Sequence, residues 1–173
     1  RAVAHAQGES IQAETALLGS RSELLAARRL HAAGDPTALA HLETQQAAIL
    51  RRTVELTQEV VARRTGAAAQ QQEAIAELRR LEAGGLRPDS PEVLSARTQV
   101  AERNRGVYRA QEQELQLRRI GIESGAPGAA RTQALQTVEA DILAVQRRLV
   151  QAGLEVESLQ AQRSVVMRER EFS

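Results

Sequence analysis

The sequence predicts an all-α protein, a long antiparallel coiled-coil helical hairpin with a break in each arm. Three observations support this fold class. The 173 residues include 31 Ala, 20 Leu and 18 Gln but only one Phe, one Tyr and no Trp, so strong helix formers dominate and the aromatic anchors of most globular cores are scarce. Apolar residues recur at spacings of three and four. Short Gly/Pro segments separate four such stretches.

The first arm is expected to cover residues 9–83, with a break near residues 34–36. A first helix is predicted from about Glu9 to Ala33. At the break, Gly34 suits the left-handed residue after a helix end, Asp35 the next N-cap and Pro36 the first helical position. The apolar positions expected in this first helix are Ile11, Leu17, Leu18, Leu24, Leu25 and Leu30.

A second helix is predicted from about Thr37 to Ala83. Its apolar stripe is interrupted by Gln46 and Gln71, and its register slips near residues 63–71, as a stutter would. The stripe consists of Leu39, Leu42, Ile49, Leu56, Val60, Ala67, Ile75, Leu78 and Leu81.

The clearest turn is predicted at residues 84–91. Gly84-Gly85 ends the second helix, Ser90 is placed to cap the next one and Pro91 to occupy its first position. A short connection between two long helices makes them antiparallel neighbours. The exposed part of the turn, expected to be the partner-binding tip of the hairpin, consists of Leu86, Arg87, Pro88, Asp89 and Ser90.

The second arm is expected to cover residues 91–172, with a break near residues 125–128. A third helix is predicted over residues 91–123, with Val93, Val100, Val107, Leu115 and Ile122 on one side. The fourth helix, predicted over residues 130–172, has the most regular seam of the chain. This seam consists of Leu135, Val138, Ile142, Val145, Leu149, Ala152, Val156, Leu159, Arg163 and Val166.

Folding about Leu86 to Pro88 pairs residue i with about residue 174 − i. Each Gly/Pro break would then lie beside continuous helix of the other arm, near Asp141 for the first break and near Ala47 for the second. This staggering favours one rod of about 110 Å, from ~75 residues at about 1.5 Å each. The alternative is an elongated four-helix bundle.

Composition and spacing argue against catalysis, cofactors and metals. The 23 basic residues, all Arg, and 22 acidic residues give a net charge of +1, with no basic stripe for nucleic acid. The absence of Cys excludes disulfides and thiolate metal sites, and His5, His31 and His41 are scattered. No apolar run approaches the ~18 residues of a membrane span. Because the chain begins at Arg1 without Met, we expect residues 1–173 to be one segment of a larger protein.

Two segments, residues 77–97 (ELRRLEAGGLRPDSPEVLSAR) and 43–52 (ETQQAAILRR), carry a family resemblance. Through them the hairpin resembles periplasmic adaptor, or membrane-fusion, proteins of type I secretion. Polysaccharide-export proteins with a coiled-coil hairpin are also similar, in residues 90–97 and 168–171. The second break, at residues 125–128, departs from the adaptor pattern.

The resemblance implies a structural hairpin of a bacterial envelope export assembly. It would lie in the periplasm and bridge an inner-membrane transporter to an outer-membrane channel, as a homo-oligomer, with the parent protein anchored in the inner membrane. The alternative function is a cytoplasmic coiled-coil scaffold or filament rod without an export role.

Overall fold

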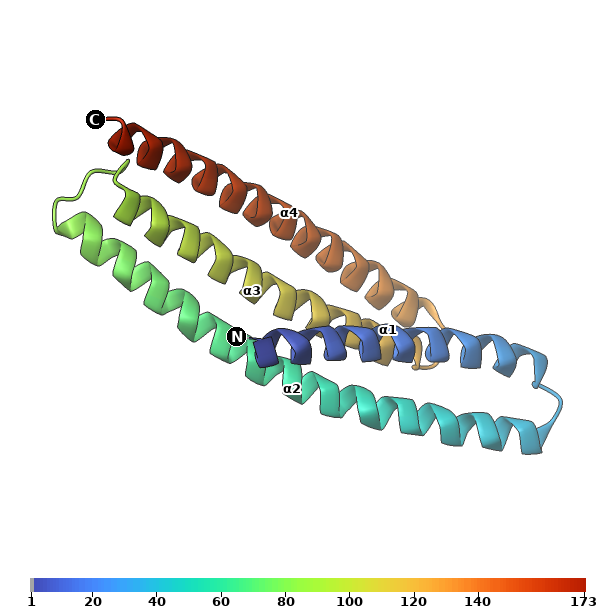
Figure 1. Cartoon of the computed structure of the whole chain (residues 1–173). Helices are drawn as coiled ribbons and strands as arrows, with labels where there is room; N and C mark the ends of the chain where they lie inside the picture. The colour runs from blue at the N-terminus through green and yellow to red at the C-terminus, as the bar shows by residue number, and fades with distance from the viewer. Residues whose placement is uncertain (1) are drawn as a thin grey trace. The chain divides into compact units, whose positions relative to one another are not determined.

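The computed structural model describes residues 2–173, so Arg1, where the predicted segment begins, lies outside the described residues. The described chain forms four helices, α1 (Ala2–His31), α2 (Pro36–Ala83), α3 (Pro91–Glu123) and α4 (Ala129–Glu171), and contains no strand. The predicted all-α class is therefore confirmed (Figure 1). The largest difference in bounds is at the first helix, which begins at Ala2 instead of near Glu9.

Side-chain caps fix the starts of α2 and α3 as expected. Asp35 Oδ1 accepts hydrogen bonds from the N–H groups of Thr37 (3.1 Å) and Ala38 (3.2 Å), and Ser90 Oγ accepts one from the Val93 N–H (3.3 Å). These bonds satisfy backbone donors that have no partner within the first helical turn. Pro36 and Pro91 are the first helical residues, where their lack of an N–H does no harm.

The expectation for Gly34 is wrong, since this residue does not adopt a positive φ. Only Gly85 and Gly128 do so within residues 2–173. At the end of α1 the Asp35 N–H instead donates to the Ala32 carbonyl (2.9 Å), so a tight turn reverses the chain without a left-handed residue. The left-handed residue that ends a helix is Gly85, with φ +81°.

The contacts divide the chain into two compact units. Unit 1 contains residues 2–61 and 113–143, and unit 2 contains residues 62–112 and 144–173. The core of unit 1 joins α1, α2 and α3 through Ile11, Leu18, Ile49, Leu56, Val60, Leu117 and Ile120. The core of unit 2 joins α3 and α4 through Leu94, Ala101, Val156 and Leu159.

In unit 1, α1 folds back on the first part of α2. Arg52 contacts Glu14, and Arg29 contacts Glu43, which makes the two helices antiparallel (Figure 1). The first break therefore reverses the chain, and the expectation that helix near Asp141 bridges it is wrong. The physical reason is that the connection is short and α1 has an apolar seam that needs a partner.

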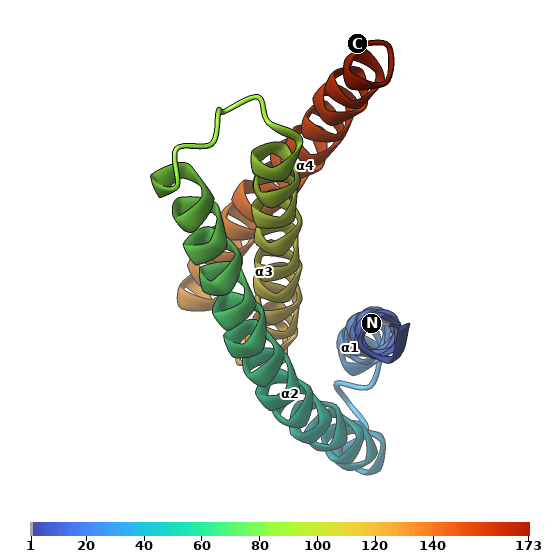
Figure 2. The ribbon, with the colours of Figure 1, turned by 60° about the vertical axis from the view of Figure 1, so that its left-hand side comes forward.

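The predicted pairing is confirmed between α2 and α3 in unit 2. Gln70 bonds to Arg103 and Gln71 to Asn104, close to the expected partner at about residue 174 − i. Gln71, which interrupts the apolar stripe of α2, thus uses its side-chain amide to bond across the helix pair (2.6 Å). The connection from α2 to α3 arches between the two helix ends (Figure 2).

The second break also reverses the chain, because α3 and α4 are antiparallel in both units. Arg119 pairs with Glu139 in unit 1, and Glu112 accepts a hydrogen bond from Gln146 in unit 2. The helix near Ala47 does lie beside this break, as expected, because the side-chain amide of Gln46 in α2 donates to the Ser124 carbonyl (2.6 Å). The chain does not continue in one direction past a break, since every break is a turn between antiparallel helices. The predicted α4 seam is confirmed at Val138, Ile142, Val145, Ala152, Val156 and Leu159, which are all buried.

Candidate functional site

The predicted turn, residues 84–91, which contains the predicted tip Leu86 to Ser90, is ordered and belongs to unit 2. The N–H groups of Gly84 and Gly85 donate to the carbonyls of Arg80 (3.0 Å) and Glu82 (3.1 Å), which completes the end of α2. The Ser90 N–H donates to the Arg87 carbonyl (3.0 Å) and closes a turn over the intervening residues. The backbone of the tip is thus held by hydrogen bonds at both ends.

Four of the five predicted tip residues are exposed together. Leu86 is 40% exposed, and Pro88 is exposed beside it. Arg87 and Asp89 form an ion pair of 3.3 Å across the turn, with side chains 84% and 65% exposed. Ser90, in contrast, is buried, with its hydroxyl committed to the α3 cap. We define the exposed tip as residues Leu86 to Asp89.

Ion pairs hold the helix ends next to the exposed tip. Arg97 of α3 contacts Glu82 of α2 (3.4 Å) and so joins the two helices. Within α2, Arg80 binds both carboxylate oxygens of Glu77, and this hydrogen bonding lowers the pKa of Glu77 from 4.5. The exposed tip therefore carries an apolar side chain and an internally balanced charge pair on a braced support, which suits contact with another protein.

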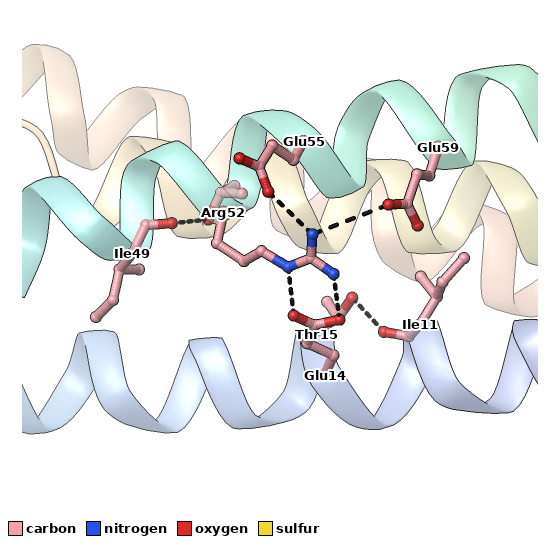
Figure 3. A network of polar contacts seen from close by, with 8 residues as sticks. Ile11, Glu14, Thr15, Ile49, Arg52, Glu55 and Glu59 are labelled. Atoms are coloured by element: carbon pink, nitrogen blue, oxygen red, sulfur yellow. Dashed lines mark hydrogen bonds and ion pairs between the residues drawn. The ribbon is translucent and has the colours of Figure 1, made fainter.

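A second polar cluster lies in unit 1 between α1 and α2 (Figure 3). The Arg52 guanidinium binds both oxygens of Glu14, with 2.9 Å for the Nη2–Oε2 contact, and also reaches Glu55 (3.0 Å) and Glu59 (3.9 Å). Hydrogen bonding to Arg52 lowers the pKa of Glu14 from 4.5. A carboxylate that is held ionised in this way is a poor proton donor. Because Glu14 lies in α1 and Arg52 in α2, the cluster joins the two helices.

Buried hydroxyls near this cluster were not anticipated by the apolar pattern. Thr15 and Thr53 are buried, and their hydroxyls donate to the carbonyls of Ile11 (2.7 Å) and Ile49 (2.8 Å) in the preceding turns. Such bonds satisfy a buried threonine without a partner on another helix. A count of apolar residues alone misses these positions.

Within residues 2–173, no three His, Cys, Asp or Glu side chains are placed to share a metal ion. An open groove of about 440 Å³ in unit 1 is lined by side chains of α2 and α3 and includes one charged residue, Arg118. No helix in the described part of the chain combines the length and the apolar character that a membrane span requires.

No protein-family model, curated protein or solved structure matches this chain.

Proposed function

We propose that this chain is a structural and interaction module without catalytic activity, belonging to a bacterial envelope export assembly. In this proposal the module acts in the periplasm, between an inner-membrane transporter and an outer-membrane channel, and the exposed tip contacts the partner. The observation that carries the proposal is the tip itself. Leu86 to Asp89 are exposed together on a turn whose two ends are capped and braced.

The chemistry of the exposed tip supports contact with protein. An exposed leucine beside a proline gives an apolar contact, and the ion-paired Arg87 and Asp89 can exchange their mutual bond for bonds to a partner. The caps restrict motion of the turn before binding, which lowers the entropy lost when a partner orders it. The adaptor-like sequence of residues 77–97 supports the export assignment.

The proposal predicts that the exposed tip is needed for export but not for folding. Leu86→Glu combined with Arg87→Glu leaves Gly85 and the Ser90 cap in place, and is expected to reduce export in cells at least about tenfold, because a buried contact charge weakens binding by more than ~1.4 kcal/mol. Export of cargo is measured together with helicity by circular dichroism. The matched control is Leu30→Glu, which alters a leucine that is 81% exposed in α1.

Deletion of residues 85–89 is the more severe test. It is expected to abolish export while the helical signal persists. Normal export by either tip variant would contradict the proposal.

The exposed apolar residues of α4 favour a second candidate, a cytoplasmic scaffold that assembles through its helices. Fractionation of cells that express the native parent protein separates the two. Recovery in the periplasmic fraction supports export, whereas recovery in the cytoplasm supports the scaffold.

A further inference from the structure

Within unit 2, α4 is apolar on two opposite sides. One side is buried and consists of Val145, Ala152, Val156 and Leu159. The other side is exposed and includes Val150 (63% exposed), Leu154 (60%) and Val165 (53%). Phe172 (90% exposed) directly follows α4 and extends this side, because its N–H still donates to the Arg168 carbonyl (3.2 Å). With about 100° per residue, from 3.6 residues per turn, the centres of the two sides lie about 170° apart. We call Val150, Leu154, Ala161, Val165 and Phe172 the outer α4 face.

The outer α4 face follows a regular period. Val150, Ala161 and Phe172 are eleven residues apart, and so are Leu154 and Val165. A period of eleven corresponds to about 3.67 residues per turn, so the residues stay in one line along a nearly straight helix. Single exposed apolar residues are common on proteins, but a continuous line of them indicates a contact surface.

The spacing along this face is the same when read from either end. About a centre between Glu157 and Ser158, Val150 mirrors Val165 and Leu154 mirrors Ala161. A surface of this kind is complementary to itself under a two-fold axis, in which each residue contacts its mirror partner on the other subunit. We propose that the outer α4 face binds the same face of a second copy of this chain, with the two α4 helices antiparallel.

The charges at the edges of the face agree with this arrangement. Arg147 and Glu169 are exposed on one edge, and the antiparallel register places Arg147 of each copy beside Glu169 of the other, which gives two ion pairs. The register also brings the Glu157 side chains of the two copies together near the axis. Arg168, on the opposite edge, gains no acidic neighbour in this register, so the apolar contacts supply most of the attraction.

The proposal specifies a surface and a register for the homo-oligomer that the adaptor resemblance implies, but it rests on the α4 contacts alone. The outer α4 face and the exposed tip belong to different segments of the chain. The export test at Leu86 and Arg87 does not depend on whether the chain self-associates. The proposal for the outer α4 face and the proposal for the exposed tip can therefore each be refuted without the other.

The first experiment is sedimentation equilibrium of the 173-residue chain. A contact between single helices lies at the small end of the range for specific interfaces, below about 1,200 Å², so dimers are expected to form at micromolar concentrations. Leu154→Glu is expected to weaken the dimer by about tenfold or more, because two carboxylates would be buried in the contact. The matched control, Leu24→Glu, alters an α1 leucine that is 50% exposed. A monomeric chain at all concentrations, or equal loss in the control, would overturn the proposal.

The second experiment tests the register through charge. Arg147→Glu and Glu169→Arg are each expected to weaken the dimer, and the chain that carries both changes is expected to recover wild-type affinity. Glu157→Gln is expected to strengthen the dimer, since it removes the repulsion at the axis. Failure of the double variant to recover would exclude the antiparallel register.

The third experiment tests the orientation by disulfide formation, which is simple because the chain contains no Cys. Ser158→Cys lies next to the axis and is expected to cross-link to itself on mild oxidation. Ser164→Cys is expected not to, since its two copies would lie about 20 Å apart along the helices, well beyond the reach of a disulfide. Equal cross-linking of both variants would indicate parallel helices and contradict the proposal.

Discussion

At the scale of single residues, the core of unit 1 is built from aliphatic side chains of moderate size. Leu56 and Leu117 have no exposed surface, and they pack with isoleucines of α1, α2 and α3. Without aromatic residues in this cluster, no single side chain dominates burial. Each fully buried leucine nevertheless contributes several contacts that no neighbour can replace.

Leu117→Ala is expected to lower the free energy of unfolding by about 2–5 kcal/mol, since it removes buried surface and leaves a cavity in close-packed helices. The measurement is urea denaturation followed by circular dichroism. Leu17→Ala, in α1, is the matched control, because this leucine is 50% exposed and should cost less than about 1 kcal/mol. A similar loss in both variants would show that Leu117 is not a core residue in solution.

The contrast between Leu17 and its neighbours shows where apolar pattern alone is insufficient. The buried seam of α1 runs through Ile11, Thr15, Leu18 and Ser22, so Leu17 and Leu24 lie outside it. The spacing of threes and fours is present, but two of its positions are hydroxyl residues. Leucine is more apolar than threonine or serine and is therefore the residue expected to be buried. Leu17 and Leu24 are nevertheless exposed, because they do not lie on the side of α1 that faces α2.

At the scale of elements, the ends of the helices follow from local chemistry. Asp35 and Ser90 accept hydrogen bonds from residues at most three positions away, and Pro36 and Pro91 act through their own fixed φ at the first helical position. The local sequence therefore contains the information needed to predict these helix ends. The exposed tip was predictable for the same reason. The burial of Ser90 was not predictable, because it depends on how the side chain of this cap residue lies against the neighbouring helices.

Gly85 provides a test at this scale. Gly85→Ala is expected to lower the free energy of unfolding by about 1–2 kcal/mol, because a residue with a Cβ is strained at φ +81°. Gly84→Ala is the control. Its φ is not positive, and an added Cβ would lie 3.4 Å from the Arg80 and Leu81 carbonyl oxygens, which is ordinary contact.

Thermal and urea denaturation of both alanine variants measure the difference. Equal stability would show that the end of α2 relaxes to another conformation.

The α3 helix shows why the single-seam prediction was incomplete. Val93 and Val107 are buried as expected, but so are Leu94, Ala101 and Leu117. A two-helix hairpin requires one apolar stripe for each helix, whereas α3 contacts α2 and α4 in unit 2 and α1 and α2 in unit 1. A helix with neighbours on several sides must bury small and large residues around most of its circumference.

At the scale of the whole molecule, the direction of the chain at each break could not be read from the breaks themselves. A Gly/Pro segment ends one helix and begins another whether the chain continues or reverses. The choice depends on contacts between distant residues, such as Glu14 with Arg52 and Arg119 with Glu139. Ion pairs between helices leave little trace in one sequence, because Arg and Glu are frequent throughout it.

The pair of Glu14 and Arg52 makes the stability of the whole chain depend on pH. Since the pKa of Glu14 is lowered from 4.5 in the folded state, its contribution is present above about pH 4.5 and is lost as the pH falls through the lower folded value. Glu14→Gln is therefore expected to reduce the free energy of unfolding at pH 7 by about 1 kcal/mol or less. The difference from wild type should shrink near pH 3.

Urea denaturation at the two pH values measures this difference. Glu23→Gln, at an exposed position of the same helix, is the control and should show a smaller change. An unchanged difference between pH 7 and pH 3 would exclude a pH-dependent role for Glu14.

The reversal of the chain at every break also has a consequence for how the protein folds. Contacts between successive helices join residues that are near in sequence, with separations of 17 for Arg29 and Gln46, 33 for Gln71 and Asn104 and 34 for Glu112 and Gln146. Short loops close at small entropic cost, and proteins with local contacts fold fast. The hydrogen bond from Gln113 to the Gly8 carbonyl closes a separation of 105 residues. Helical hairpins should therefore form early, and the docking of α1 onto α3 should be the slow, late step.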